Sequence, residues 1–328
     1  MEWRKDEWWN GDLAKDIHDT LKLKENLICG LQGNSPLMYL RRYLVDWLAL
    51  TCQKFRLNGN AQHLAVTLYD RFTDLYTVSV DDLKVLVVCC LLIASKFEER
   101  EEKIPKFKLL MEGLQWQLKA SDYLHMELRI LSAFGWNIGF STASHYKDFY
   151  MQVALGSHDL HVGRPLVNRE EAYIYMEKNV NYFLEVSLQD PAFLVFKPSL
   201  ITAACLASAR ICLHISPTWT SEMRRQSNFT WSHLVPCIEI LLRLHDEDRK
   251  ATQESAKASS AVQHQMALNS TGNTPIASPV PPQMTEDSAS LQQYQAQYGC
   301  MVAPVAPAAH SSLAPIYRYN RGYSMKRT

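Results

Sequence analysis

Residues 85–102 read VLVVCCLLIASKFEEREE, and this stretch decides the fold. Its first ten positions are apolar or small without a break, which leaves no polar face on a helix. A helix that is apolar all round has to be buried all round, so we expect residues 79–97 to form a central helix. Lys96 stands where that buried helix ends, directly before Phe97 and an acidic run. A charged side chain at the end of a buried helix needs a specific explanation.

Helical periods continue on both sides of the central helix. The sequence shows no convincing alternation of strands and helices, which argues against a doubly wound or barrel enzyme. We therefore expect an all-α fold. Helices are predicted at 36–55, 61–76, 79–97, 102–113, 120–134, 143–155, 169–188, 198–215 and 231–245.

A second stretch, SLITAACLASARICLH at 199–214, resembles residues 81–97 in being apolar all round and in carrying a run of small residues. We interpret this as an internal repeat, so the predicted architecture is a helical bundle duplicated once, with about five helices in each copy. The predicted domains are an N-terminal segment with an amphipathic helix at 1–35, two bundles at 36–140 and 141–250, and a disordered low-complexity tail at 251–328.

Composition limits the classes of function. The formal net charge of zero does not favour nucleic acid as a partner, and the apolar run is shorter than the ~18 residues that a membrane span needs. Eight cysteines without a CxxC pair indicate core thiols in a reducing compartment and no metal site. Without a Gly-rich phosphate loop, HExxH or GxSxG motif, we expect no catalytic residues and no cofactor.

Charged residues inside otherwise apolar helices are the first candidate site. Arg41, Asp70, Lys96 and Glu127 all fall in such helices. Each of them alone is best explained by a solvated face. Four together favour organised pairs, because a buried charge is costly unless it is paired. The predicted pairs are Arg41 with Asp70 and Lys96 with Glu127.

The helix at 36–55 has two apolar faces. One of them holds Leu40, Tyr43, Leu44 and Trp47 at positions i, i+3, i+4 and i+7. Either both faces are core, which the pattern alone favours, or this face is a docking surface.

The chain resembles the cyclin family in four motifs that occur in the family's order. They are LRRYLVDWL at 40–48, HLAVTLYDRF at 63–72, LLIASKFEE at 91–99 and HMELRIL at 125–131. The resemblance covers 36–140 strongly, as a first cyclin box, and 141–250 weakly, as a second.

The resemblance implies a regulatory subunit that binds a cyclin-dependent serine/threonine kinase as a heterodimer and activates it in cell-cycle control. Such a subunit is not itself an enzyme. In the family, residues matching Lys96 and Glu127 contact the kinase near its αC helix, and Arg41 with Asp70 form a buried structural pair. The implied apolar contacts are Ile93, Phe97, Leu131, Trp136 and Ile138. The alternative is a cyclin-fold adaptor in transcription or another complex, without kinase activation.

By the same resemblance, the face with Leu40, Tyr43, Leu44 and Trp47 docks substrates or inhibitors that carry an Arg-x-Leu motif. Three positions depart from the family pattern. Leu50 stands where an acid receives the arginine of the motif, and Val80 and Lys84 replace an arginine and a glutamine. We therefore expect weak or altered Arg-x-Leu binding.

The predicted tail contains two minimal sites for a proline-directed kinase, Thr274-Pro275 and Ser278-Pro279. An idle flexible tail is an equally good explanation of its composition. The last twelve residues, YRYNRGYSMKRT, are mildly basic. We expect the protein in the nucleus and the cytoplasm.

Overall fold

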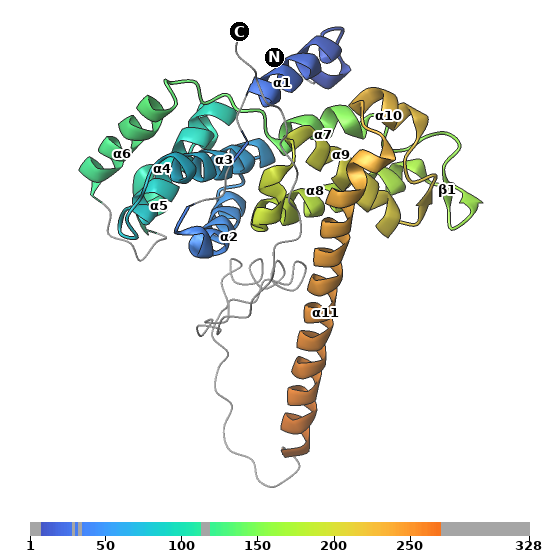
Figure 1. The fold of residues 1–328 in the computed structure, drawn as a ribbon. Helices are drawn as coiled ribbons and strands as arrows, with labels where there is room; N and C mark the ends of the chain where they lie inside the picture. Colours follow the sequence, from blue (N-terminus) through green and yellow to red (C-terminus); the bar gives the residue numbers. More distant parts are fainter. Residues whose placement is uncertain (1–7, 28–29, 32–34, 113–118, 270–328) are drawn as a thin grey trace, which may run out of the picture. The chain divides into compact units, whose positions relative to one another are not determined.

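Two helical bundles lie side by side in the computed structural model, which describes residues 8–27, 30–31, 35–112 and 119–269 (Figure 1). The chain divides into two units, 1–247 and 248–328, and both bundles belong to the first. Each bundle has its own hydrophobic core of buried residues. The prediction of two tandem bundles is confirmed.

The first bundle is built around α4 (Asp82–Glu98), as the opening stretch predicts. Every residue from Val85 to Ser95 is buried, because α4 packs against α3 (Gly59–Leu75) on one side and α6 (Ala120–Ala133) on another. α2 (Met38–Lys54) and the short α5 (Phe107–Glu112) complete the bundle, with the single-turn helix η2 (Glu101–Lys103) after α4. The Asn58 side chain caps α3 by accepting the Ala61 N–H at 2.8 Å.

The second bundle repeats this plan around α9 (Pro198–Cys212), which packs against α7 (Ala143–Met151) and α8 (Arg169–Gln189). The two bundles differ in the exposure of the basic residue near the end of the central helix. Arg210 near the end of α9 is fully buried, whereas the Lys96 side chain near the end of α4 is half exposed. Arg210 forms two hydrogen bonds with Asp159, at 2.7 and 2.8 Å, and donates to backbone carbonyls of Ala154 and Pro217.

Three features differ from the prediction or were missed by it. A small antiparallel sheet of order β2-β1-β3 joins β1 (Leu160–His161), β2 (Arg164–Pro165) and β3 (Ile215–Ser216). A short helix, α10 (Ser221–Ser227), follows this sheet. The last helix, α11 (Trp231–Asn269), runs beyond 250, so the predicted disorder from 251 is wrong up to 269. Ala, Gln, Lys and Glu in 251–269 are good helix formers although they offer little surface to bury.

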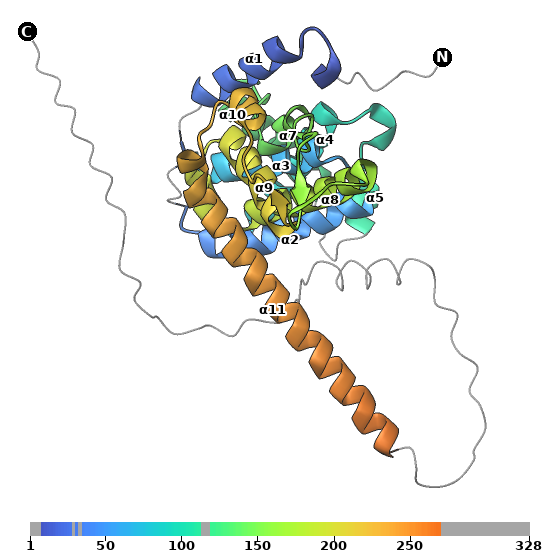
Figure 2. The ribbon, with the colours of Figure 1, turned by 90° about the vertical axis from the view of Figure 1, so that its right-hand side faces the viewer.

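The predicted N-terminal helix is present as α1 (Ala14–Leu27), and it packs on the second bundle (Figures 1 and 2). His18 is buried and its ring stacks on Phe149, with ring centroids 4.6 Å apart. Glu25 accepts hydrogen bonds from the backbone N–H and the hydroxyl of Ser199, at 3.0 and 2.6 Å. α1 therefore also satisfies the first turn of α9. The single-turn helices η1 (Trp8–Asn10) and η3 (Pro191–Val195) complete the described elements.

The predicted pair of Arg41 and Asp70 is confirmed, and it does more than join α2 to α3. Arg41 donates to both carboxylate oxygens of Asp70, at 2.7 and 2.8 Å. Its remaining terminal nitrogen donates to the carbonyls of Leu188 and Gln189 at the end of α8, at 2.8 and 3.2 Å. One buried guanidinium thus stabilises the first bundle and holds it to the second.

Five cysteines within the described part of the chain are buried, and they are distributed over both cores. Cys52, Cys89 and Cys90 lie in the first core, and Cys205 and Cys237 lie in the second. Burial raises the pKa of the Cys237 thiol to about 12, and it raises those of Cys89 and Cys205 as well. The described residues include no helix that is both long and apolar enough to cross a membrane.

Candidate partner-binding site

Lys96 and Glu127 meet on the surface where α4 and α6 adjoin, as predicted. The Lys96 ammonium donates to Glu127 Oε1 at 2.6 Å and to the Tyr123 hydroxyl at 3.1 Å. Tyr123 in turn donates to the same Glu127 oxygen at 2.9 Å. We call these three residues the Lys96 cluster. Its lysine side chain is 50% exposed, so the charge is available to another molecule.

Tyr123 is the member of the cluster that the sequence did not reveal. A tyrosine on the buried face of a helix is normally core, and its ring does lie in the core, 5.0 Å from that of Phe107. Its hydroxyl nevertheless reaches the surface and fixes the other two side chains. Partial burial lowers the pKa of Lys96, but the hydrogen bonds with Glu127 and Tyr123 outweigh this effect and raise the pKa. Lys96 therefore stays charged at physiological pH.

The apolar residues expected around the cluster differ in their exposure to solvent. Phe97 and Trp136 are 53% and 65% exposed, and Leu131 and Ile138 are partly buried against the first core. Ile93 is only 3% exposed. The expectation that Ile93 contacts a partner is corrected, because its side chain faces inward from the middle of α4.

Two further leucines extend this apolar surface. Leu124 and Leu128 on α6 are 58% and 54% exposed, and with Glu127 and Leu131 they follow the i, i+3, i+4, i+7 spacing of one helix face. That spacing can be read from the sequence, although the sequence alone does not show whether this face is core or exposed. The surface therefore consists of a charged cluster with large exposed apolar side chains beside it.

The backbone around Gly135 and Gly139 determines where the exposed side chains of Trp136 and Phe97 lie. Gly135 and Trp136, which follow α6, both have positive φ, 56° and 63°. A tryptophan in this conformation is unusual, and the Trp136 N–H donates to the Leu131 carbonyl at 2.8 Å to close the helix end. Phe97 lies close to Gly139, where a Cβ atom would come within 3.3 Å of its ring.

The first two glutamates of the acidic run after Phe97 have a structural role. Glu98 Oε1 lies 3.1 Å from His145 Nε2 of α7, which joins the two bundles. Glu99 accepts the backbone N–H of Asn58 at the start of α3. These two glutamates therefore hold the end of α4 in place.

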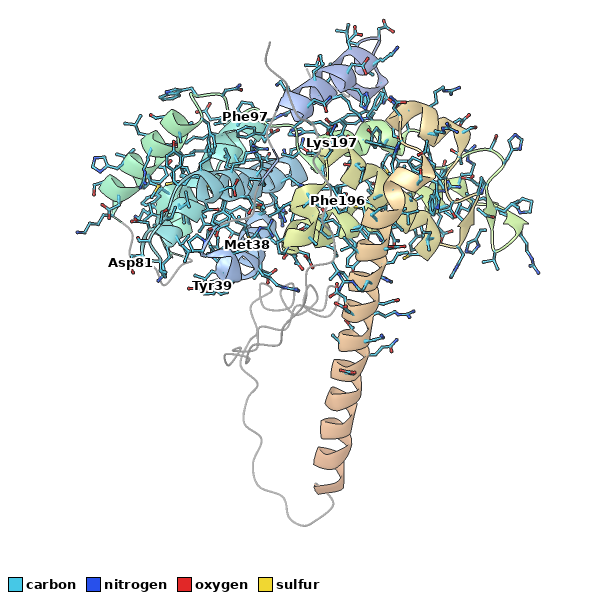
Figure 3. All side chains as sticks on the ribbon, in the orientation of Figure 1. Met38, Tyr39, Asp81, Phe97, Phe196 and Lys197 are labelled. Atoms are coloured by element: carbon cyan, nitrogen blue, oxygen red, sulfur yellow. The ribbon has the colours of Figure 1, made fainter. Side chains whose placement is uncertain are left out.

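The candidate docking face on α2 is less open than its spacing suggests. Tyr43 is 58% exposed, Leu40 and Trp47 are partly buried against the first core, and Leu44 is only 4% exposed. Tyr39, which the sequence did not single out, is 73% exposed. Figure 3 places Tyr39 at the opposite side of the first bundle from Phe97, so this face is distinct from the surface around Lys96.

Changing Leu50→Glu together with Lys84→Gln is expected to strengthen binding of an Arg-x-Leu peptide by about tenfold. The new carboxylate would receive the arginine of the peptide, and a repelling charge would be removed. Fluorescence anisotropy with a labelled peptide measures the effect, and Leu50→Gln/Lys84→Gln is the uncharged control. If the unchanged protein binds the peptide as tightly as a conventional cyclin does, and Trp47→Ala abolishes that binding, the expectation of weak docking is wrong.

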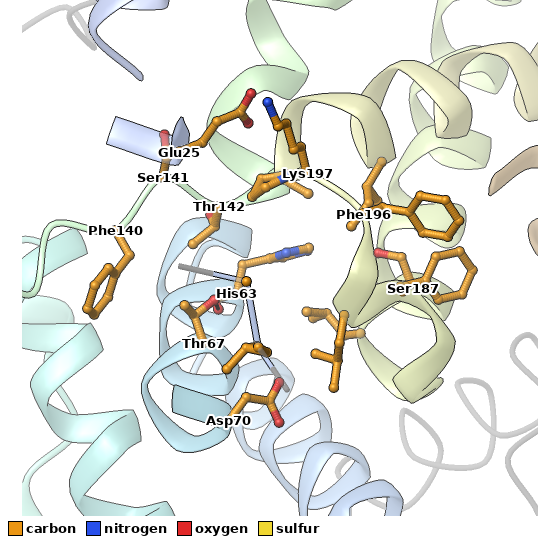
Figure 4. Close-up of a pocket in the computed structure, with 18 of the residues that line it drawn as sticks. Glu25, His63, Thr67, Asp70, Phe140, Ser141, Thr142, Ser187, Phe196 and Lys197 are labelled. Carbon is orange, nitrogen blue, oxygen red and sulfur yellow. Dashed lines mark hydrogen bonds between the residues drawn. The ribbon is translucent and has the colours of Figure 1, made fainter. Parts of the chain in front are cut away.

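A cavity of about 330 Å³ lies where the two bundles and α1 meet (Figure 4). His63 of α3 points into it, near Thr142 and Ser187, and Glu25 and Lys197 lie at one edge. Burial, with the nearby His145, lowers the pKa of His63 to about 3, so this imidazole is neutral at physiological pH. Among the described residues, no three His, Cys, Asp or Glu side chains are grouped to hold a metal.

Comparison with known proteins defines the class. The family model "Cyclin, N-terminal domain" matches residues 17–139, and "Cyclin, C-terminal domain" matches residues 165–271. Cyclin-J of Xenopus laevis is 40% identical over 327 residues, which cover 94% of this chain and 83% of the relative. The chain belongs to the cyclin family.

Within the family, the chain is similar to the J type. Cyclin-J of Homo sapiens is 39% identical, with 82% of this chain and 71% of the relative covered. In the sequence, the tryptophan-rich start WWNGDLAKDIHDTL, SPLMYLRRY and ASKFEEREEKIPK carry this resemblance, and the comparisons confirm it. A viral cyclin from herpesvirus saimiri has the same fold, with a TM-score of 0.55 at 20% identity over 69% of this chain and 94% of that one.

Proposed function

We propose that this cyclin is the regulatory subunit of a cyclin-dependent serine/threonine kinase, which it binds and activates in cell-cycle control. The observation that carries the proposal is the Lys96 cluster, a half-exposed, hydrogen-bonded ion pair beside the exposed side chains of Phe97, Leu128 and Trp136. A charged group among apolar side chains suits a surface that another protein covers.

The mechanism follows from what a protein kinase needs. Its αC helix has to place a glutamate against the lysine that contacts ATP. A subunit that binds only the conformation with αC in place shifts the population of the kinase towards that conformation. The apolar side chains would pack against αC, while Lys96, held by Glu127 and Tyr123, would donate to backbone carbonyls of the kinase.

This proposal makes the chain a non-catalytic activator, present in the nucleus and the cytoplasm. Thr274 and Ser278 would be phosphorylated by the bound kinase, and both lie outside the described residues. The face around Tyr43 would be a second contact, for substrates or inhibitors.

A pull-down from an extract of dividing cells tests the function. We expect the tagged chain to recover a protein kinase that phosphorylates histone on the beads, and mass spectrometry of the bound band would name it. Recovery of other proteins without any kinase would support the alternative of a cyclin-fold adaptor.

A further inference from the structure

Four basic side chains line a hollow of about 740 Å³ between α1 and the second bundle. Lys15 and Lys22 come from α1, Lys197 from the residue before α9, and Arg225 from α10. The Lys197 ammonium donates to the side-chain oxygen of Asn26 in α1 at 2.7 Å. Two acids, Asp19 and Glu25, line the same hollow, so its described lining has an excess of two positive charges.

The two acids are committed to other groups. Glu25 is 6% exposed and accepts two hydrogen bonds from Ser199, which occupy both of its carboxylate oxygens. Its distance to the Lys22 ammonium is 4.0 Å, the limit of an ion pair. Asp19 lies 3.4 Å from His18 Nδ1 and is largely open to water. The two carboxylates therefore offset only part of the positive charge in the hollow.

Lys22 shows the imbalance most clearly. Its ammonium donates to the Ser227 carbonyl at 3.3 Å and lies 4.1 Å from the centre of the Phe229 ring. Burial lowers the pKa of Lys22, and the charge of Lys197 lowers it further, although Glu25 and Asp19 act in the opposite direction. An anion in the hollow would stabilise this partly buried charge.

Lys15 and Arg225 are exposed, and neither forms an ion pair with an acid within the described part of the chain. Their charges are therefore available to a ligand. Phe149 and Phe229 add apolar surface to the same hollow. The combination fits a ligand that carries negative groups on a chain with some apolar surface.

We propose that this hollow binds a segment of polypeptide that carries several carboxylate or phosphate groups. The volume is far larger than one carboxylate or phosphate needs. A nucleic-acid strand is disfavoured, because two acids lie among the four cations and the chain has no net positive charge. The inference does not rest on the proposed kinase partner, because none of its residues belongs to the surface around Lys96.

Fluorescence anisotropy with the full-length chain tests the inference. The probes are a labelled short peptide of Asp, Glu and Ser, the same peptide with its serines phosphorylated, and a neutral peptide of Asn, Gln and Ser. We expect saturable binding of the two anionic peptides, tighter for the phosphorylated one, and none of the neutral one. Inorganic phosphate should compete only weakly, because it fills one part of the hollow.

The variant Lys15→Glu/Arg225→Glu is expected to weaken peptide binding by about tenfold or more. Lys106→Glu/Lys178→Glu is the matched control, since it makes the same change of net charge at exposed lysines elsewhere, and it should change binding by less than about twofold. Lys197→Met, at an exposed position, provides a milder second variant, expected to weaken binding about threefold. Equal losses in the test and control variants, or no saturable binding of any anionic peptide, would overturn the proposal.

Discussion

The variant Lys96→Ala/Glu127→Ala is expected to recover about a hundredfold less kinase than the unchanged chain, with histone phosphorylation on the beads falling in proportion. Lys96 and Glu127 are joined at 2.6 Å and lie among apolar side chains that a partner would cover. Truncating one partner of a charged pair that becomes buried in an interface costs about 2–5 kcal/mol. For the double variant we expect a loss of about 2.7 kcal/mol, a hundredfold, because the kinase loses the charged donor of Lys96.

The matched control is Arg243→Ala/Glu247→Ala, which removes another ion pair with both side chains exposed, at 3.8 Å. It should leave kinase recovery within about twofold of the unchanged chain. Tyr123→Phe keeps the ring in the core and removes only the hydroxyl that orients Lys96, so we expect an intermediate loss of about three- to tenfold. Undiminished recovery with the double variant would show that the surface around Lys96 is not where the kinase binds.

Asp159→Ala is expected to lower the free energy of unfolding by about 3–5 kcal/mol. Arg210 is fully buried, and without Asp159 its charge would be left in the core with only carbonyl partners. Urea unfolding followed by circular dichroism measures the change. The lost stability would come from the broken ion pair and not from a weakened helix, because Asp159 lies in the loop before β1.

Two further variants separate the buried charge from other effects of the substitution. Asp159→Ala/Arg210→Met removes both charges and should recover part of the lost stability, because no unpaired charge then remains in the core. Glu247→Ala breaks an exposed pair and should cost less than about 0.5 kcal/mol. A loss below about 1 kcal/mol for Asp159→Ala would contradict the structural importance of this pair.

Much of the fold follows from the sequence, because burial leaves a pattern along a helix. The run from Val85 to Ala94 has no polar position, and this alone places α4 at the centre of its bundle. The sheet could not be predicted in this way, since strands such as Leu160–His161 are too short to show an alternating pattern. The extension of α11 to Asn269 was missed because helix formers such as Ala and Gln leave no apolar face to recognise.

The sequence predicted the charged residues of the candidate site, but it did not show which apolar residues around them are exposed. Pairing explains why Lys96 and Glu127 stand in apolar helices, and that argument holds from the sequence alone. Whether an apolar residue faces the core or the solvent depends on how the helices pack. For this reason Ile93 was wrongly assigned to the surface, and the exposed Leu128 was not singled out. Tyr123 stands four residues before Glu127 on α6, but the hydrogen bonds of its hydroxyl group with Glu127 and Lys96 cannot be read from that spacing.

The distribution of cysteines gives each bundle a natural reporter of its own opening. Thiolates react with alkylating reagents, whereas buried thiols with raised pKa stay inert until the surrounding structure opens. Cys89 and Cys90 therefore report on the first bundle, and Cys205 and Cys237 on the second, without any introduced label. Comparing the labelling rates of the two sets would show whether the bundles open together or one at a time, and so whether Arg41 makes them a single cooperative unit.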